Sequence, residues 1–350
     1  MAENDNNYKR VAIACQGGGS HTAFTAGVLK KLLGEKHTRA HDDYEIVALS
    51  GTSGGSICAL LAWYGLLMDD TSKAIELLDS FWKDNSANSP WDRLLNDWLL
   101  QTSRLFANFG GTPTISPYFY PSQGQDLLKA MIEKYVDFGR LRELVGPSSP
   151  LLLVGAVNVL SGTFKAFRSH NFVGDGHKVF NDSPADGISV EAILASAAIP
   201  VLFRAVDIGK DVYWDGLFSQ NPPVRELPDA KPSEIWVVQI DPETHDSEPK
   251  KMSNILDRRN ELAGNLSLNQ EIYFIEKINE WVKNGSLSGT KHEIIKVKWI
   301  KMLRDLDAES KLNRDPDFIQ GLMAYGEEQA AGFLEEEFGR QVVVDSGRIG

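Results

Sequence analysis

Two strand–turn–helix patterns lie close together near the N-terminus. Residues 10–15 and 45–49 are short apolar runs, which predict buried strands. Apolar positions three or four residues apart follow each run, over 21–33 and 57–63, and predict helices. Both connecting segments are rich in glycine, so we expect two tight turns there.

The C-terminal third has a helix–strand–helix pattern. Apolar residues recur at helical spacing over 254–284 and 317–337, whereas residues 295–299 alternate between apolar side chains and lysine. The sequence therefore predicts two helices and a half-buried strand, which we expect to pack on the rest of the chain.

The second glycine turn, residues 51–55, contains a G-x-S-x-G pentapeptide with Ser53 at its centre. Between a strand and a helix, this motif exposes a serine nucleophile on a strained turn. The helix that begins there points the positive end of its dipole at the reacting carbonyl. The motif alone is a weak signal, because a serine that caps an ordinary helix gives the same letters.

The first glycine turn, residues 16–21, contains three consecutive glycines. Such a segment can form a nest of backbone N–H donors, which suits a developing oxyanion. A nucleotide site fits less well. No lysine follows the glycines until Lys30, and Thr22 stands where a dinucleotide-binding loop needs its last glycine. The sequence therefore favours an oxyanion hole.

A serine nucleophile needs a base. Only His245 and His292 lie in the C-terminal third, where an α/β-hydrolase carries its histidine. Both stand in polar segments, and we interpret them as solvated histidines. Asp215 is a better candidate, because it ends the apolar run 212–214 and Gly216 follows it directly. An ordinary turn aspartate is the alternative.

These motifs resemble those of patatin-like phospholipases, which are lipid acyl hydrolases with a Ser–Asp dyad. The order and spacing of five blocks are far more specific than any one block, and the resemblance covers residues 8–245. The matching blocks are the glycine loop 17–19, the pentapeptide 51–55, the run 195–200, Asp215-Gly216-Leu217 and Asn221-Pro222-Pro223-Val224.

The resemblance implies an α/β fold in three layers, with a central, mostly parallel sheet and helices on both faces. It implies that Ser53 is the nucleophile, that Asp215 is its general base, and that no metal or cofactor takes part. The oxyanion hole would be formed by Gly17, Gly18 and Gly19. It would be supported by His21 and Gly54.

The first loop departs from the family pattern at Gln16, His21 and Thr22. His21 stands where the family has Arg or Lys, and a partial positive charge on it could stabilise the oxyanion in a pH-dependent way. A histidine that only caps the helix start is an equal alternative. Leu217 replaces a small residue and could narrow the site. None of these changes removes a dyad residue.

The 350 residues contain no linker or internal repeat that would divide them into domains. We expect a frayed segment over 1–7 and a single domain over 8–350. Its catalytic core would span 8–245, with an aromatic-rich helical insertion over 70–125, and 250–350 would add the C-terminal helices and strand. The insertion could be a cap that buries its own aromatics or could line an acyl-chain pocket.

The net charge of −12 argues against a nucleic acid partner and against electrostatic docking on anionic membranes. Neutral or zwitterionic lipid surfaces stay open for transient contact. The longest apolar run, 57–68, is too short to span a bilayer, and the polar N-terminus predicts no secretory signal. Cys15 and Cys58 fall in predicted buried elements and indicate reduced thiols, so we expect a cytoplasmic or peripheral membrane protein.

The sequence favours a serine acyl hydrolase of the phospholipase A or lysophospholipase type. A soluble carboxylesterase or thioesterase with the same dyad would share every motif, and chain-length preference would separate the two. A catalytically weak lipid-binding protein would account for the loop departures, and ester turnover would exclude it. The sequence carries no signal for an oligomeric state.

Overall fold

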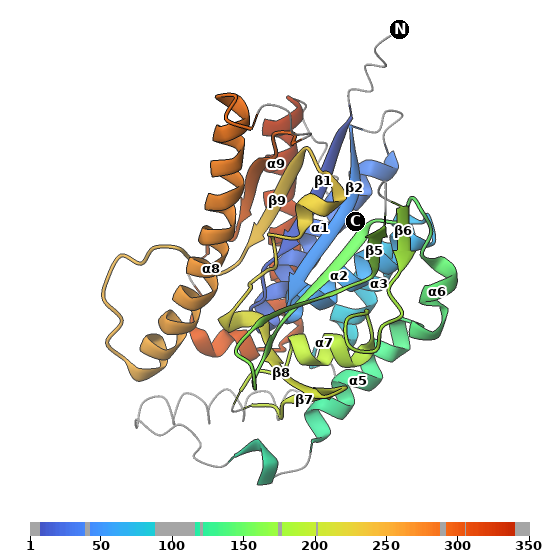
Figure 1. Cartoon of the computed structure of the whole chain (residues 1–350). Coiled ribbons are helices and arrows are strands. Elements are labelled where there is room, and N and C mark those ends of the chain that lie inside the picture. The colour runs from blue at the N-terminus through green and yellow to red at the C-terminus, as the bar shows by residue number, and fades with distance from the viewer. Residues whose placement is uncertain are drawn as a thin grey trace, which may run out of the picture.

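The computed structural model describes residues 8–38, 43–87, 116–119, 122–173, 177–200, 202–287, 292–304 and 306–339. These residues form a large twisted sheet with helices on both faces and a small hairpin at one side (Figure 1). The expected α/β fold with a mostly parallel central sheet is confirmed.

The sheet has the strand order β10-β9-β1-β2-β3-β8-β7, and β4 also pairs with β3. The five strands from β10 to β3 are parallel, whereas the pairs that join β3 to β4, β3 to β8 and β7 to β8 are antiparallel. The strands are β1 (Lys9–Cys15), β2 (Tyr44–Thr52), β3 (Leu151–Asn158), β4 (Phe164–Arg168), β7 (Val206–Ile208), β8 (Asp211–Asp215), β9 (Glu234–Gln239) and β10 (Lys296–Lys301); β5 (His170–Val173) and β6 (His177–Phe180) form the hairpin.

Two cores lie on opposite faces of the sheet, because successive side chains of a strand point to opposite faces. Along β1, Val11 and Ile13 enter the larger core, whereas Ala12 and Ala14 enter the smaller one. The larger core is covered by α1 (Ala23–Thr38), α2 (Gly54–Leu67), α3 (Thr71–Asn85), α7 (Val190–Ser196) and α9 (Pro316–Phe338), and the smaller one by α8 (Met252–Lys283). The fold thus has three layers.

Short elements complete the described chain. They are α5 (Gln123–Tyr135), α6 (Leu141–Leu144) and the 3₁₀ turns η1 (Gly19–Thr22), η2 (Pro117–Phe119), η3 (Phe138–Arg140), η4 (Gly216–Phe218), η5 (Leu227–Ala230) and η6 (Ala308–Leu312). The helix expected to begin at His21 begins instead at Ala23, because the glycine loop first closes the 3₁₀ turn η1. Across the part of the chain that the structure describes, no helix is both long and apolar enough to cross a membrane.

Antiparallel pairing brings Asp215 to the end of the sheet where the parallel strands finish. Thr52, the last residue of β2, pairs with Gly155 on β3. Asp215, the last residue of β8, pairs with the next residue, Ala156, from the other side of β3. The residue after Thr52 and the residue that ends β8 therefore flank the same point of β3.

The aromatic-rich insertion is described only in part. Phe81 and Trp82 are buried on α3, as a cap that packs its own aromatics requires, whereas Tyr118 and Phe119 are exposed on η2. Trp91, Trp98, Phe106, Phe109 and Tyr120 lie outside the described residues. Cys15 and Cys58 are free and buried, and burial raises the pKa of both thiols, that of Cys58 to about 12. The expectation of thiols without a disulfide is therefore confirmed.

Candidate active site

Ser53 stands at a sharp turn between β2 and α2. Its φ of 55° and ψ of −132° lie in a region that non-glycine residues rarely adopt, and such strain gathers at functional sites. A Cβ on Gly51 would collide with the carbonyl of Gly55, so the turn needs glycine at its start. Ser53 holds the N-cap position, yet its side chain makes no capping hydrogen bond. The geometry is that of a nucleophile elbow rather than an ordinary cap.

Ser196, at the end of α7, holds this elbow in place. The N–H of Ser53 donates to Ser196 Oγ at 2.9 Å, and that hydroxyl donates to the carbonyl oxygen of Gly155 at 2.6 Å. Ser196 therefore links the strained backbone of the elbow to β3. The sequence marked this residue only as part of the 195–200 block and did not indicate its contact.

Asp215 is fully buried beside the elbow. Its Oδ1 accepts a hydrogen bond from the N–H of Leu217 at 2.8 Å, whereas its Oδ2 has no hydrogen-bond partner. Burial raises the pKa of Asp215 to about 7, against the smaller lowering effects of the Leu217 N–H and the Ser53 hydroxyl. The Ser53 hydroxyl is thus near enough to act on the carboxyl, although it does not form a well-directed hydrogen bond with Oδ2.

The first glycine loop lies directly against the elbow. A Cβ on Gly17 would sit 2.8 Å from Ser53 Cβ, so glycine is required there for the two turns to approach. The N–H of Gly17 donates to Asn221 Oδ1 at 2.6 Å and is therefore not available to an oxyanion, contrary to the role that the sequence predicted for it. Among the described residues, the N–H groups of Gly18, Gly19 and Gly54 have no hydrogen-bond partner, and these three glycines are partly exposed.

Gln16, immediately before this loop, is at the centre of a buried polar network. Its Oε1 accepts from the N–H groups of Ile240 and Asp241, each at 2.8 Å. Its Nε2 donates to Asn265 Oδ1 on α8 at 2.9 Å and to the carbonyl oxygen of Asn221 at 3.5 Å. The side chain that departs from the family pattern thus ties the glycine loop to β9, to α8 and to the segment after the dyad strand.

His21 is a neutral, buried histidine. Burial and the nearby Lys311 ammonium lower its pKa to about 3, and its Nε2 lies 2.7 Å from Ser310 Oγ. The partial positive charge considered for His21 is therefore not supported, because the ring is buried and already close to a cation. The capping alternative is not supported either, because the ring contacts η6 rather than the start of the helix.

Lys311 forms an ion triad beneath the glycine loop. Its Nζ lies 3.1 Å from Asp241 Oδ1 and 2.7 Å from Asp257 Oδ1, and these carboxylates raise its pKa despite burial. Its backbone carbonyl lies so close to Gly19 that a Cβ there would collide with it. No pattern in the sequence indicated that residues near 311 would reach the loop.

Comparison with known families bears on this arrangement. The sequence profile of the patatin-like phospholipase family matches residues 13–228, a range that holds both Ser53 and Asp215. The match covers well over half of the chain. The chain belongs to the patatin-like phospholipase family. The family is one of lipid acyl hydrolases, as the resemblance of the five motifs implied.

Solved structures of similar fold include proteins of two bacteria. VipD from Legionella pneumophila has a TM-score of 0.45 and 13% identity, over 94% of this chain and 67% of that one. ExoU, in its heterodimeric complex with SpcU from the type III secretion system of Pseudomonas aeruginosa, has a TM-score of 0.37 and 14% identity, over 95% of this chain. The matched region covers about half, 52%, of the length of the matched chain in that structure. No curated protein matches the sequence.

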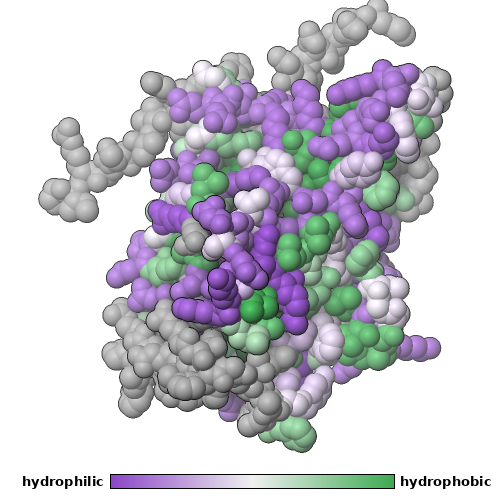
Figure 2. All heavy atoms as spheres, turned by 90° about the vertical axis from the view of Figure 1, so that its left-hand side faces the viewer, coloured by the Kyte–Doolittle hydropathy of each residue, from purple (hydrophilic) through white to green (hydrophobic). Residues whose placement is uncertain are grey.

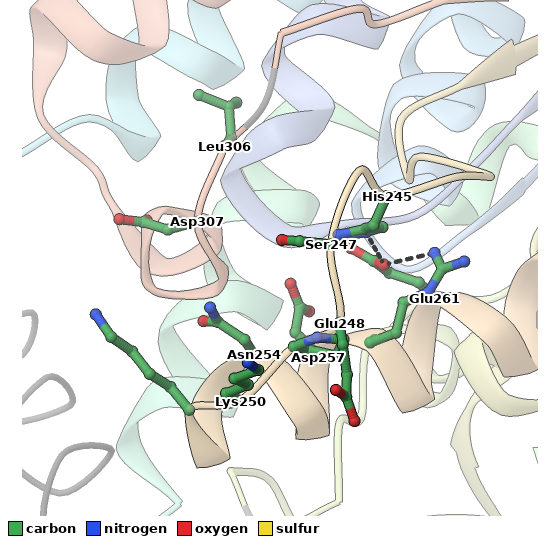
Figure 3. Close-up of a pocket in the computed structure, with 12 residues that line it drawn as sticks. His245, Ser247, Glu248, Lys250, Asn254, Asp257, Glu261, Leu306 and Asp307 are labelled. Carbon is green, nitrogen blue, oxygen red and sulfur yellow. Dashed lines mark hydrogen bonds and ion pairs between the residues drawn. The ribbon is translucent and has the colours of Figure 1, made fainter.

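Among the described residues, no histidine forms a hydrogen bond with Ser53 or Asp215. His245 is exposed, as expected of a solvated histidine, and its Nε2 also lies 2.9 Å from Glu261 Oε2 on α8. Arg258 reaches the same carboxylate at 3.1 Å. Figure 3 shows His245 and Glu261 at the side of a hollow of about 750 Å³, which Arg258 also lines, between the loop after β9, the start of α8 and the segment before η6. Neither Ser53 nor Asp215 lines that hollow.

The part of the chain that the structure describes offers no metal-ligand cluster. Over these ranges, no group of three or more His, Cys, Asp or Glu side chains is arranged to hold a metal ion. The polar groups beside Ser53 include the Asp215 carboxyl and the Ser196 hydroxyl, and backbone N–H groups lie in the adjoining turns. A carboxyl and N–H donors are groups that an acyl transfer uses.

Proposed function

We propose that this chain is a serine acyl hydrolase of phospholipids or lysophospholipids in which Ser53 and Asp215 form the catalytic dyad. The observation that carries the proposal is a strained serine beside a fully buried carboxyl that has one unpartnered oxygen. A buried polar atom without a partner costs free energy, and such atoms concentrate where chemistry uses them. Family membership supplies the class of substrate.

In the first half-reaction, Ser53 Oγ attacks the ester carbonyl carbon while Asp215 takes the hydroxyl proton on Oδ2. The tetrahedral intermediate then expels the alcohol, which receives that proton from Asp215, and an acyl ester remains on Ser53. The raised pKa makes Asp215 a stronger base than an ordinary carboxylate, and a base whose pKa is near the working pH is the most effective.

In the second half-reaction, water attacks the acyl-enzyme and gives a proton to Asp215, which returns it to Ser53 as the fatty acid leaves. The negative oxygen of both intermediates needs donors. The open N–H groups of Gly18, Gly19 and Gly54 support this role, and one such donor is typically worth about 10²–10³ in rate. Gly17 acts as the spacer that brings the two turns together, and His21 supports the loop through η6 without a charge.

Covalent labelling tests the nucleophile. A fluorophosphonate probe followed by peptide mass spectrometry should label Ser53 and no other serine, and Ser53→Ala should abolish both labelling and hydrolysis of a fluorescent phosphatidylcholine. Ser56→Ala is the matched control, because Ser56 lies one turn along α2 and its hydroxyl only bonds the carbonyl of Ser53. Phospholipid hydrolysis that survives in Ser53→Ala would exclude the dyad.

Substrate length then tests the lipid assignment. A phospholipase should hydrolyse long-chain phosphatidylcholine and lysophosphatidylcholine faster than a butyrate ester at equal concentration. Faster turnover of the short ester, or of a thioester, would contradict the lipid assignment and favour the soluble esterase or thioesterase.

A further inference from the structure

Helix α8 is apolar on two opposite faces. Its inner face places Leu268, Ile272 and Ile275 in the smaller core, against the sheet. A helix on the surface of a globular protein normally has one apolar face and one polar face, and a helix with apolar side chains all round is normally covered. The outer face of α8 is therefore unusual among surface helices.

The outer face carries a stripe of large apolar side chains that solvent reaches. Tyr273 is 58% exposed and Phe274 is 65% exposed. Apart from the adjacent pair Tyr273 and Phe274, successive members are separated by three, four or seven residues, which places them on one side of a helix. We call this set the α8 stripe: Met252, Ile255, Leu262, Leu266, Tyr273, Phe274, Ile278 and Trp281. Figure 2 views the side of the molecule on which α8 lies, and hydrophobic side chains appear there among hydrophilic ones.

The charges on the same face are two cations and one carboxylate. Arg259, Lys277 and Glu280 fall at the helical spacing of the stripe, and Lys277 Nζ lies 2.7 Å from Glu280 Oε2, which leaves Arg259 as the excess positive charge. The carboxylates Asp257, Glu261 and Glu271 point the other way, where they bond Lys311, Arg258 and the backbone after the dyad strand. In a chain of net charge −12, this face is a local exception.

We infer that the α8 stripe is the face by which the protein docks on a phospholipid bilayer surface. This inference rests on the proposed lipid substrate. Aromatic side chains with a polar tip, such as Tyr273 and Trp281, prefer the boundary between lipid head groups and acyl chains. Arg259 and Lys277 complement the phosphate groups at that depth, and their aliphatic stems lie along the apolar surface.

A second copy of the chain fits the stripe less well. A two-fold contact places the same face of each copy against the other. Arg259 and Lys277 would then be buried against a face that presents the same two cations, and Glu280 is already paired with Lys277. Burial of charges without new partners opposes such a contact.

The position of α8 couples this surface to the dyad region. The N-terminal half of the helix forms a wall of the site: Asn265 bonds Gln16, and Gly264 packs against Asn221 and the carbonyl of Leu217. The stripe lies on the opposite side of the same helix. A bilayer in contact with the stripe is therefore separated from the dyad loops only by the thickness of one helix.

Flotation with vesicles tests the docking surface. The whole chain should float with phosphatidylcholine vesicles. The double variant Tyr273→Glu/Phe274→Glu should lower the coefficient for partition onto the vesicles at least tenfold, because two rings that enter the bilayer surface are replaced by two charges. Leu160→Glu is the matched control, since Leu160 is 71% exposed in the turn after β3, outside the stripe, and the variant should float like the wild type. All three proteins should unfold at the same temperature.

Two further readouts make each outcome decisive. Turnover of a soluble butyrate ester should be equal in the wild type and the double variant, because neither residue touches the dyad. If the wild type turns over the ester but does not float, or if the double variant floats equally well, the docking inference is overturned while the proposed function stands. If the wild type floats through the stripe but hydrolyses no ester, the proposed function fails alone. A dimer that the double variant dissociates, together with no flotation, would assign the stripe to a second copy.

Discussion

Asp215 and Asp241 are two buried aspartates at strand ends that differ in the charges beside them. Both lie at the carboxyl ends of sheet strands, Asp215 as the last residue of β8 and Asp241 just after β9, and solvent reaches 0% and 2% of them. Burial raises the pKa of both. Asp241, however, lies 3.1 Å from the ammonium of Lys311, whereas no cation of the described residues forms an ion pair with Asp215. Both carboxyls have oxygen atoms without a hydrogen-bond partner, so the counterion is what separates the two.

The difference shows how one fold uses a buried carboxyl for two purposes. A nearby counterion lowers the pKa of a buried carboxyl and opposes the effect of burial, as Lys311 does for Asp241. A carboxyl without one is poised between its two protonation states near neutral pH. The absence of a counterion, and not burial alone, therefore marks the carboxyl that is suited to general base work.

The largest expected effect is on turnover. Asp215→Asn should lower kcat for phosphatidylcholine by about 10²–10⁴, because the amide cannot accept the Ser53 proton. Asp241→Asn should keep kcat within about threefold, because Asp241 meets Lys311 and contacts the catalytic loops only through its backbone. Equal losses in the two variants would remove the distinction between the two aspartates.

The next effect is on stability. Lys311→Met leaves Asp241 and Asp257 without their shared cation and should lower the free energy of unfolding by about 3–5 kcal/mol in urea denaturation. Lys301→Met is the control, because the pair that Lys301 forms with Glu243 is more than a third exposed and should be worth less than about 1 kcal/mol. A loss in Lys311→Met no greater than in the control would show that the triad is solvated.

The pH dependence of turnover comes third. Asp215 must be ionised to accept a proton, and its pKa is raised to about 7, so kcat/KM should fall about tenfold per pH unit below that value and level off above it. The sign follows from the base being active only when deprotonated. Initial rates on a soluble ester between pH 5 and 9 measure the acidic side of the profile of kcat/KM against pH. An apparent pKa near the usual aspartate value of about 4 would mean that Asp215 is hydrated in solution.

The smallest effect is expected at His21. His21→Gln should change kcat less than about threefold and leave the pH profile as it is, because the histidine is neutral above about pH 3 and its side chain contacts Ser310 and Phe318, not Ser53 or Asp215. A profile in which the wild type loses activity above pH 6 and the variant does not would restore the charged role that the sequence suggested.

The two proposed dyad residues could be named from the sequence because each of them lies in a local motif, and the structure places them side by side. Ser53 and Asp215 are both marked by the strand before them and the glycine after them, and the elements around them follow from apolar spacing in neighbouring residues. The strand and helix boundaries shifted by only a few residues, as at Ala23, where the glycine loop forms a 3₁₀ turn before the helix.

The residues that hold the two glycine turns in place could not be predicted, because they act through contacts between positions far apart in the chain. Lys311 reaches the loop near Gly19 from nearly 300 positions away, and nothing in the letters around Lys311 marks it. The neutral state of His21 could not be predicted for the same reason, since its pKa depends on burial by η6 and on that lysine. The occupied N–H of Gly17 depends on the distant Asn221 side chain.

Gln16 has a consequence for the order in which the protein is made. It joins the glycine loop to Ile240, Asp241 and Asn265, so the loop reaches its final hydrogen bonds only after α8 has left the ribosome and docked. Ser53 and Asp215 both emerge earlier. Under the proposed mechanism, a growing chain that already holds Ser53 and Asp215 still lacks the hydrogen bonds that fix its glycine loop until α8 has docked.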